Sequence, residues 1–234
     1  MKIKNIFKYL DPFIYLDLLL EKYIGNPDTK IKKILYWVFY IIYSFLLAYL
    51  LYFILSLVFG VSMPLAIVVS SSMEPSLYRG DLVIVTKADN LKSQVVELNY
   101  NIANKDIKDF AELNYKNNIY NLREIDSIKI DNQIIDINSI TNNDTVIYRS
   151  NLKNIDIVHR LVVYIKAKDG NFVLTKGDNF KTNRLIDQDC NIDEDTGLPK
   201  NQCLNIYPTS INMIKGKIIG KIPYIGYIKL IFFG

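Results

Sequence analysis

The chain has few of the residues that proteins use to bind zinc. Its 234 residues include one histidine, His159, and two cysteines, Cys190 and Cys203, with no CxxC pair. A zinc site needs about four ligands, usually supplied as closely spaced Cys and His pairs, so we expect no zinc site and no other cofactor. Both cysteines lie in one polar segment. They either form a disulfide, if that segment is outside the cytoplasm, or stay as two free thiols.

An excess of one charge sign is also missing. With 28 Lys and Arg against 24 Asp and Glu, the formal net charge is +4, and the lysines are spread along the chain instead of forming one basic face. Nucleic acid is therefore not an expected partner. Hydrophobic residues make up 50% of the chain, which is high for a soluble protein and indicates that part of the chain lies in lipid.

Charged residues are absent from the run between Ile34 and Val61. A helix needs about 20 apolar residues to cross a bilayer. The apolar core of a cleavable signal peptide has only about 7 to 15 residues and lies nearer the start of the chain. The run therefore predicts a transmembrane helix over residues 34–61.

The basic residues around this run predict its orientation. Seven lysines precede it, whereas no lysine or arginine follows it until Arg79. By the positive-inside rule, residues 1–33 are expected in the cytoplasm and residues 62–234 outside it. Residues 5–24 alternate apolar clusters with charges, which suits a helix on the inner membrane face or one packed against the transmembrane helix. The seven lysines are Lys2, Lys4, Lys8, Lys22, Lys30, Lys32 and Lys33.

Three consecutive serines, Ser70 to Ser72, follow the predicted transmembrane helix. The apolar residues 66–69 lead into them, and Arg79-Gly80-Asp81 then leads into a second apolar run. This pattern predicts a strand, a polar turn and another strand. Taken alone, serines in such a place more often belong to a solvated loop than to a catalytic site.

The residues around the serines are more specific than the pattern. The motif Ser70-x-Ser72-Met73-x-Pro75-x-Leu77, followed by Gly80-Asp81, resembles the nucleophile box of the type I signal peptidases, peptidase family S26. The resemblance implies that Ser72 is the nucleophile and that Met73 points into the core. It also implies that the Ser70 hydroxyl and the Ser72 backbone N–H bind the oxyanion. The family usually has glycine where this chain has Ser71.

A serine hydroxyl needs a neighbouring base to become a good nucleophile. A lone histidine in a strand is more often structural. However, the segment Val158-His159-Arg160-Leu161-Val162 is similar to the box in which archaeal and endoplasmic-reticulum signal peptidases carry histidine, where most bacterial enzymes carry lysine. The resemblance implies that His159 is the general base.

A third box follows His159. The segment from Leu174 to Asn179, Leu-Thr-Lys-Gly-Asp-Asn, resembles the family's Thr-Lys-Gly-Asp-Asn motif and implies that Asp178 orients His159. Without the other boxes, Gly-Asp-Asn predicts only a turn. Lys176 offers an alternative base, because a buried lysine with a lowered pKa can accept a proton from serine.

The family carries a second acidic residue about six positions beyond this aspartate. Here that position is Arg184. Asp187 is the nearest acidic substitute if the chain has a small insertion, and Asp189 is the fallback.

Two further segments, at the end and in the middle of the chain, have an expected structure. Residues 216–227 resemble the closing box of the family, a strand and turn with several glycines, and residues 228–233 are expected to finish the sheet or enter the membrane interface. The polar stretch at about 88–142 has no counterpart in the motif order and is interpreted as an insertion that forms extra strands or a cap.

Together these features predict a mostly β fold. A single N-terminal transmembrane helix would precede an extracytoplasmic domain that the resemblance implies to be a coiled sheet or partly open barrel. The implied function is that of a membrane-bound serine endopeptidase, which removes signal peptides from translocated preproteins at the cell membrane or the endoplasmic-reticulum membrane. The implied partners are preprotein signal peptides, the lipid bilayer and the protein-translocation machinery. The alternatives are a catalytically inactive membrane-tethered scaffold and a Ser-Lys peptidase.

Overall fold

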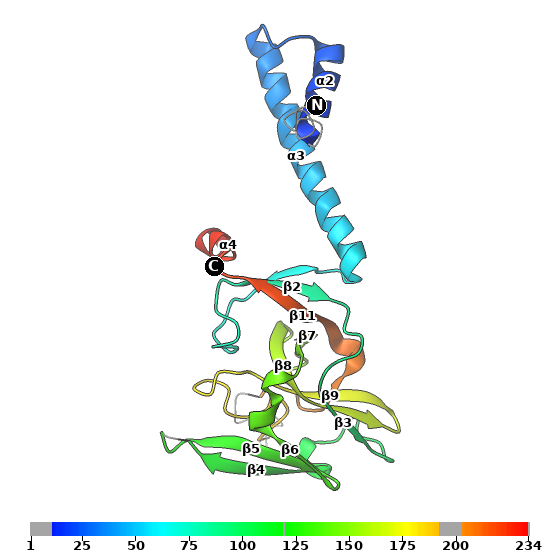
Figure 1. Ribbon diagram of the computed structural model, residues 1–234, viewed down its shortest axis with the longest axis vertical. Coiled ribbons are helices and arrows are strands. Elements are labelled where there is room, and N and C mark those ends of the chain that lie inside the picture. The colour runs from blue at the N-terminus through cyan, green and yellow to red at the C-terminus, as the bar shows by residue number, and fades with distance from the viewer. Residues whose placement is uncertain (1–10, 119, 192–202, 234) are drawn as a thin grey trace, which may run out of the picture. The chain divides into compact units, whose positions relative to one another are not determined.

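The structure is a computed structural model that describes residues 11–118, 120–191 and 203–233 (Figure 1). It divides into two compact units, Met1–Val58 and Phe59–Gly234. The first unit consists of the helices α2 and α3. The second contains the strands and a short C-terminal helix.

Helix α2 (Pro12–Ile24) packs along the first half of helix α3 (Lys30–Phe59). Asp11 caps α2, because its side chain accepts a hydrogen bond from the Phe13 N–H at 2.9 Å. The hydroxyl of Tyr43 in α3 donates to the Pro12 carbonyl at 3.1 Å, and the Tyr43 ring contacts Phe13 edge to face. Of the two placements expected for the N-terminal segment, packing against the long helix is the one observed.

Among the described residues, α3 is the single helix long and apolar enough to cross a membrane. It has 30 residues, and its most apolar stretch is 0% buried within the protein. An apolar surface of this kind is stable in lipid and costly in water. Lys2, Lys4 and Lys8, on which the orientation partly rests, lie outside the described residues, and the orientation stays a prediction.

The second unit is built on an eight-stranded sheet, which confirms a mostly β fold. Its strands lie in the order β1-β2-β11-β7-β8-β9-β10, and β3 pairs with β8. All pairings are antiparallel except that of β3 with β8. The path starts at β1 and ends at β10, and the partly open barrel stays a prediction. The strands are β1 (Leu65–Ile67), β2 (Leu82–Thr86), β3 (Gln94–Glu97), β7 (Thr145–Arg149), β8 (Asp156–Ala167), β9 (Gly170–Lys176), β10 (Thr209–Ser210) and β11 (Ile214–Ile222).

Most of the stretch expected as an insertion forms a second sheet that shares the core of the first, whereas β3 near its start joins the main sheet. The strands of the second sheet, β4, β5 and β6, pair in sequence order. Ile128 and Ile135 from this sheet are buried in one cluster with Val163 and Leu174 of the main sheet. The insertion is therefore packed onto the scaffold of the site instead of standing apart from it. The elements are η1 (Ile107–Asp109), β4 (Ala111–Asn117), β5 (Arg123–Ile130), β6 (Gln133–Asp136) and η2 (Ile137–Asn142).

The C-terminal segment corrects one expectation. A turn, η3 (Ile211–Met213), leads into β11, and residues 227–233 form the helix α4 (Tyr227–Phe233) instead of finishing the sheet. The other alternative, entry into the membrane interface, stays a prediction. β11 ends where Pro223 follows, because proline has no N–H to donate to a neighbouring strand. The Gly226 N–H donates to the Gly80 carbonyl at 2.9 Å, which ties the closing box to the turn after the three serines.

Candidate active site

Ser72 lies in a turn between β1 and β2 whose two ends are hydrogen-bonded together. The Val68 N–H donates to the Asp81 carbonyl at 2.9 Å, and the Gly80 N–H donates to the Val68 carbonyl at 2.8 Å. Met73 is 1% exposed and packs in a core cluster with Val68, as expected. Because Met73 is buried, its neighbour Ser72 is fixed at the rim of the core.

The third box holds this turn from the other side. The Asn179 N–H donates to the Ser72 carbonyl at 2.9 Å, and the Asn179 side-chain amide donates to the Ser71 carbonyl at 2.8 Å. A Cβ at Gly177 would lie 2.6 Å from the Ser72 carbonyl oxygen, closer than real Cβ contacts. Glycine is therefore required here for the two segments to approach.

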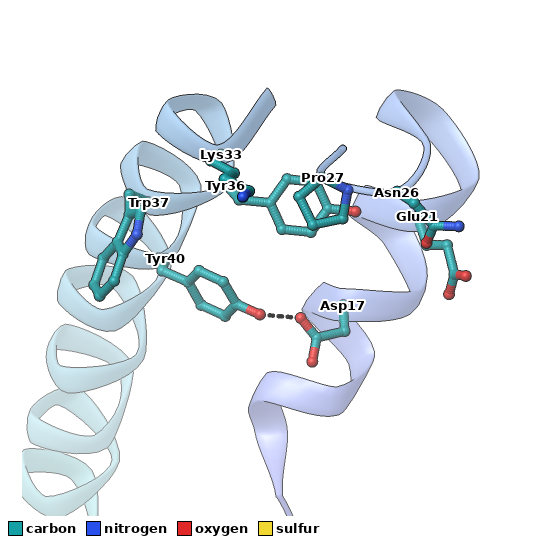
Figure 2. A pocket seen from close by; sticks show the side chains of 8 residues that line it. All are labelled: Asp17, Glu21, Asn26, Pro27, Lys33, Tyr36, Trp37 and Tyr40. Carbon is teal, nitrogen blue, oxygen red and sulfur yellow. Dashed lines mark hydrogen bonds between the residues drawn. The ribbon is translucent and has the colours of Figure 1, made fainter. Parts of the chain in front are cut away.

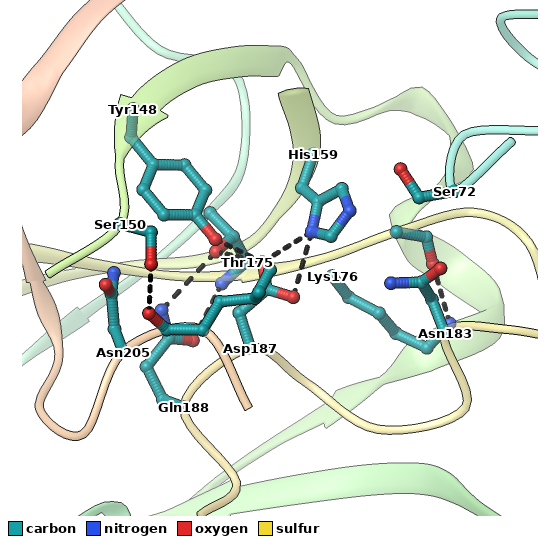
Figure 3. A network of polar contacts seen from close by, with 12 residues as sticks. Ser72, Tyr148, Ser150, His159, Thr175, Lys176, Asn183, Asp187, Gln188 and Asn205 are labelled. Carbon is teal, nitrogen blue, oxygen red and sulfur yellow. Dashed lines mark hydrogen bonds and ion pairs between the residues drawn. The ribbon is translucent and has the colours of Figure 1, made fainter. Parts of the chain in front are cut away.

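His159 lies on β8 opposite Val146 of β7 and is 2% exposed. Its Nδ1 is 2.9 Å from Oδ1 and 2.7 Å from Oδ2 of Asp187 (Figure 3). Figure 3 places Ser72 on the side of the imidazole away from Asp187, with no hydrogen bond drawn between the serine and the histidine. Catalytic hydrogen bonds are often long before substrate binds.

Asp187 is 3% exposed and is held by both its side chain and its backbone. Its Oδ2 accepts hydrogen bonds from the Tyr148 hydroxyl at 2.8 Å and the Thr175 hydroxyl at 2.6 Å. Its carbonyl accepts from the N–H groups of Leu204 at 2.8 Å and Asn205 at 3.1 Å. A buried carboxylate needs such donors, because water is not there to solvate its charge.

Ser70, Ser72, His159 and Asp187 line one groove of about 1300 Å³. Residues of β1 form an apolar wall of this groove, and β1 pairs only with β2 in the described sheet. The free edge of β1 therefore leaves main-chain groups available to an extended peptide. The structure thus joins a serine, a histidine and a carboxylate beside an apolar groove with an open strand edge.

No protein-family model matches this chain. It is 29% identical over 183 residues to the signal peptidase complex catalytic subunit sec11 of Schizosaccharomyces pombe, and the alignment covers 78% of this chain and 74% of that protein. The resemblance to type I signal peptidases of the endoplasmic-reticulum subtype is confirmed.

Asp178, expected to orient His159, lies elsewhere in this signal peptidase-like unit. Its Oδ1 accepts from Nε of Arg160 at 2.8 Å, and its Oδ2 accepts from a terminal guanidinium nitrogen of Arg160 at 2.6 Å. Successive side chains on a strand point to opposite faces, so Arg160 and His159 on β8 face opposite ways. The placement of Asp178 beside His159 is therefore wrong, because Asp178 lies on the face of Arg160.

The fallback residue Asp189 also has a different neighbour. Its Oδ2 accepts a hydrogen bond from the hydroxyl of Tyr115, in the inserted sheet, at 2.8 Å. Burial and this hydrogen bond raise the pKa of Tyr115, so its hydroxyl stays protonated as a donor. Of the acidic residues considered from the sequence, Asp187 is the one bonded to His159.

Lys176 is buried at the end of β9, and its Nζ donates to the carbonyl of the next residue, Gly177, at 2.9 Å. Burial lowers the pKa of this lysine, although the charges of Asp178 and Asp187 act in the opposite direction. Lys176 is not among the residues that line the groove. A lowered pKa is compatible with a basic role, but the amino group donates to a backbone carbonyl and lies outside the groove lining.

The two cysteines form a disulfide, Cys190–Cys203, with Cα atoms 5.2 Å apart. The Cys190 Sγ also lies 3.2 Å from the Asn205 carbonyl oxygen. Since Leu204 and Asn205 hold the Asp187 carbonyl, the disulfide joins two segments that meet at the acid. The first of the two alternatives open for the cysteines is the one observed.

The first unit has its own hollow, of about 720 Å³, between α2 and α3 (Figure 2). Tyr36, Trp37 and Tyr40 of α3 line it together with Asp17 and Glu21 of α2. The Tyr40 hydroxyl donates to Asp17 across it. No group of three or more His, Cys, Asp or Glu side chains suited to a metal ion occurs in the described parts of either unit.

Sequence reasoning missed three of the groups that shape the site. Thr175 and Asn179 lie inside the third box, so the motif contained a signal for them, but a motif does not say which atoms its members contact. Tyr148 stands in the apolar strand β7, and a single tyrosine there gives no signal of a hydrogen bond to a residue 39 positions away.

Proposed function

We propose that this chain is a membrane-anchored serine endopeptidase that cleaves signal peptides from preproteins. Ser72 is the nucleophile, His159 the general base and Asp187 the acid that orients the histidine. The observation that carries the proposal is the buried pair of His159 and Asp187, 2.7 Å apart, at the groove that also contains Ser72. The similarity to the sec11 catalytic subunit supports the signal-peptide substrate.

The position of Asp187 beside Nδ1 decides which nitrogen of the imidazole carries the proton. A carboxylate accepts hydrogen bonds, so the proton of neutral His159 lies on Nδ1 and the lone pair lies on Nε2. Nε2 takes the proton of the Ser72 hydroxyl while Oγ forms a bond to the scissile carbonyl carbon. The carbonyl oxygen becomes an oxyanion. Asp187 stabilises the imidazolium that results.

In the next step the proton passes from His159 to the leaving group. The tetrahedral intermediate collapses, the C–N bond breaks, and His159 gives its proton to the departing amine. The product is an acyl-enzyme on Ser72. Water then attacks the ester carbonyl with His159 again as base, which releases the signal peptide and restores the serine.

Ser70 is proposed to bind the oxyanion together with the backbone N–H of Ser72. The two serine hydroxyl oxygens are 3.1 Å apart, which places the Ser70 hydroxyl next to the proposed nucleophile. A donor of this kind typically contributes a factor of about 10² to 10³ to kcat. Ser71 takes no part in this scheme beyond its carbonyl, which Asn179 binds.

The anchor and the groove fit a substrate held in a bilayer. We propose that residues 34–61 span the membrane, with residues 1–33 in the cytoplasm and residues 62–234, which carry the groove, on the other side. Signal peptides themselves have an apolar core that enters lipid. An anchored enzyme meets such a substrate at high local concentration. Preprotein signal peptides, the bilayer and the protein-translocation machinery are the proposed partners, at the cell or endoplasmic-reticulum membrane.

Cleavage of a radiolabelled preprotein by the full chain in detergent micelles tests the function. Wild type is expected to cleave, whereas Ser72→Ala and His159→Ala are each expected to abolish cleavage, and His159→Lys is expected not to restore it. Ser71→Ala is the matched control and should retain cleavage. A Ser72→Ala variant that cleaves at the wild-type rate overturns the mechanism. A folded wild type that cleaves nothing favours the inactive scaffold.

A further inference from the structure

Asp187 accepts more hydrogen bonds than are needed to orient one histidine. Its Oδ2 is 2.7 Å from Nδ1 of His159, 2.8 Å from the Tyr148 hydroxyl and 2.6 Å from the Thr175 hydroxyl. Three donors therefore converge on one carboxylate oxygen in a site from which solvent is excluded (Figure 3). Each donor disperses the carboxylate charge, so each affects how strongly Asp187 attracts the proton of His159.

The direction of the Thr175 hydrogen bond is set by its neighbours. Gln188 accepts from the Thr175 N–H through Oε1 at 3.1 Å and donates through Nε2 to Thr209 at 3.0 Å. The same Nε2 lies 3.4 Å from the Thr175 hydroxyl oxygen. With the amide oriented in this way, the Thr175 hydroxyl accepts from Gln188 and directs its own proton to Asp187. Thr175 is thus a fixed donor to the acid.

The Tyr148 hydroxyl is a fixed donor for a different reason. Tyr148 is 0% exposed in the middle of β7, between its register partners on β8 and β11. Burial, and next the charge of Asp187, raise the pKa of Tyr148 well above its ordinary value. The phenol therefore keeps its proton throughout the pH range in which a histidine titrates. Unlike a threonine hydroxyl, its oxygen is carried on a rigid ring that is packed on all sides.

We propose that Tyr148 is a positioning residue of the active site, whose hydroxyl holds the Asp187 carboxylate against His159 and disperses part of the charge that this carboxylate presents to the imidazole. The inference rests on the proposed function, since it assumes that His159 must be neutral to accept the proton of Ser72. Tyr148 touches neither the nucleophile nor the substrate groove; it acts through Asp187.

The variant Tyr148→Phe removes the oxygen and keeps the ring. With one donor lost, the Asp187 charge is less dispersed and pairs more strongly with the imidazolium, so the acidic limb of kcat/KM is expected to move to higher pH by about half to one unit. The freed carboxylate also loses a positional restraint. We expect kcat to fall about tenfold on the alkaline plateau, with KM within about twofold of wild type.

The matched control is Tyr115→Phe. Tyr115 also donates its hydroxyl to a buried aspartate, but that residue is Asp189 instead of Asp187. This control should leave the position of the acidic limb unchanged. Both variants are assayed as full chains in detergent with the same preprotein, and thermal unfolding is recorded for each.

A second substitution tests the role without removing the hydroxyl, in case Tyr148→Phe fails to fold. Replacing Tyr148 with 3-fluorotyrosine preserves the shape nearly intact and makes the phenol a stronger donor. The acidic limb should then move to lower pH, opposite to the shift in Tyr148→Phe. A purely structural tyrosine predicts no shift in either variant.

The results distinguish the proposed function from the positioning role of Tyr148. If wild type does not cleave, or if Ser72→Ala cleaves equally well, the proposed function is wrong. If wild-type cleavage depends on Ser72 but neither change at Tyr148 moves the acidic limb, the function stands and the positioning role of Tyr148 is wrong. Opposite shifts in the two variants support the role.

Discussion

Arg160 holds Asp178 through two hydrogen bonds of 2.8 and 2.6 Å, on the face of β8 opposite His159. The same guanidinium donates to the Asn143 carbonyl at 2.7 Å and to the Ser76 hydroxyl at 3.1 Å. The aspartate of the third box thus helps to connect β8 with the segment that follows the serine turn. Its neighbours place Asp178 in the scaffold, whereas Asp187, which is bonded to His159, is the proposed catalytic acid.

Substitutions of Asp187 and Asp178 are therefore expected to give different results. Asp187→Asn should lower kcat by a factor of about 10³ to 10⁴, because an amide permits the wrong histidine tautomer. Asp178→Asn should lower kcat less than about tenfold but destabilise the fold by about 1–3 kcal/mol, because Arg160 loses a charged acceptor. Preprotein cleavage and urea unfolding of both variants are the measurements. Equal loss of activity at the two positions would contradict the assignment.

Gly177 predicts a steric effect on the nucleophile. In Gly177→Ala the new methyl group would lie 2.6 Å from the Ser72 carbonyl oxygen, so the serine turn must move. A displacement of about 1 Å costs on the order of 10²-fold in rate. Gly220→Ala is the control, since a Cβ there meets only Ile84 at an ordinary 3.7 Å. Cleavage rates of the two variants should differ by at least tenfold, and similar rates would show that Gly177 does not position Ser72.

Lys176 predicts a pH effect on stability. Its folded-state pKa is lowered by burial, so between that value and the unfolded value of about 10.4 the unfolded chain binds more protons than the folded one. Lys176 should therefore increase the free energy of unfolding as pH rises through this range. It should decrease the free energy of unfolding as pH falls toward the lowered pKa. Lys176→Met should remove this contribution, which urea unfolding from pH 7.5 to 10.5 will show.

The same variant separates the two candidate bases. If His159 is the base, Lys176→Met should keep cleavage within about fivefold of wild type, because Nζ donates to the Gly177 carbonyl and Lys176 does not line the groove that contains Ser72. A Ser-Lys mechanism instead predicts complete loss in Lys176→Met and residual activity in His159→Ala.

Reduction of the disulfide is expected to weaken the site. Removing it in Cys190→Ala/Cys203→Ala should lower the free energy of unfolding by about 2–4 kcal/mol, the usual value for a short loop. Because the Leu204 and Asn205 N–H groups hold the Asp187 carbonyl, kcat should fall more than KM changes. Dithiothreitol should reproduce both effects in wild type and have none on the double variant, which serves as the control.

Much of the site was predictable because it is encoded locally. The place of Ser72 before Met73, the single histidine and the uncharged run of α3 are properties of short stretches that need no partner to be recognised. The extra strands at 88–142 also follow from local alternation of apolar and polar residues. By contrast, these strands share a core with the main sheet because residues far apart in sequence, such as Ile128 and Val163, are buried in one cluster.

The identity of the acid shows most clearly what could not be predicted from the sequence. In the sequence, Asp178 lies in the third box, whereas Asp187 is only the acidic residue nearest to the position at which the family carries its second acid. The spacing is not decisive, because a loop can lengthen by a few residues without changing the fold. The alternation of side chains on β8 contained a usable hint, since Arg160 and His159 cannot both face Asp178.

The sequence by itself determined the apolar helix, the strand-rich second unit, the serine turn and the histidine, because each is written in adjacent residues. Only the tertiary structure decided which carboxylate meets His159, that Tyr148 and Thr175 bind that carboxylate, and that the cysteines are joined. Those choices depend on how the loop after β9 folds back over β7 and β8, and the free energy of that packing comes from residues distant in the chain.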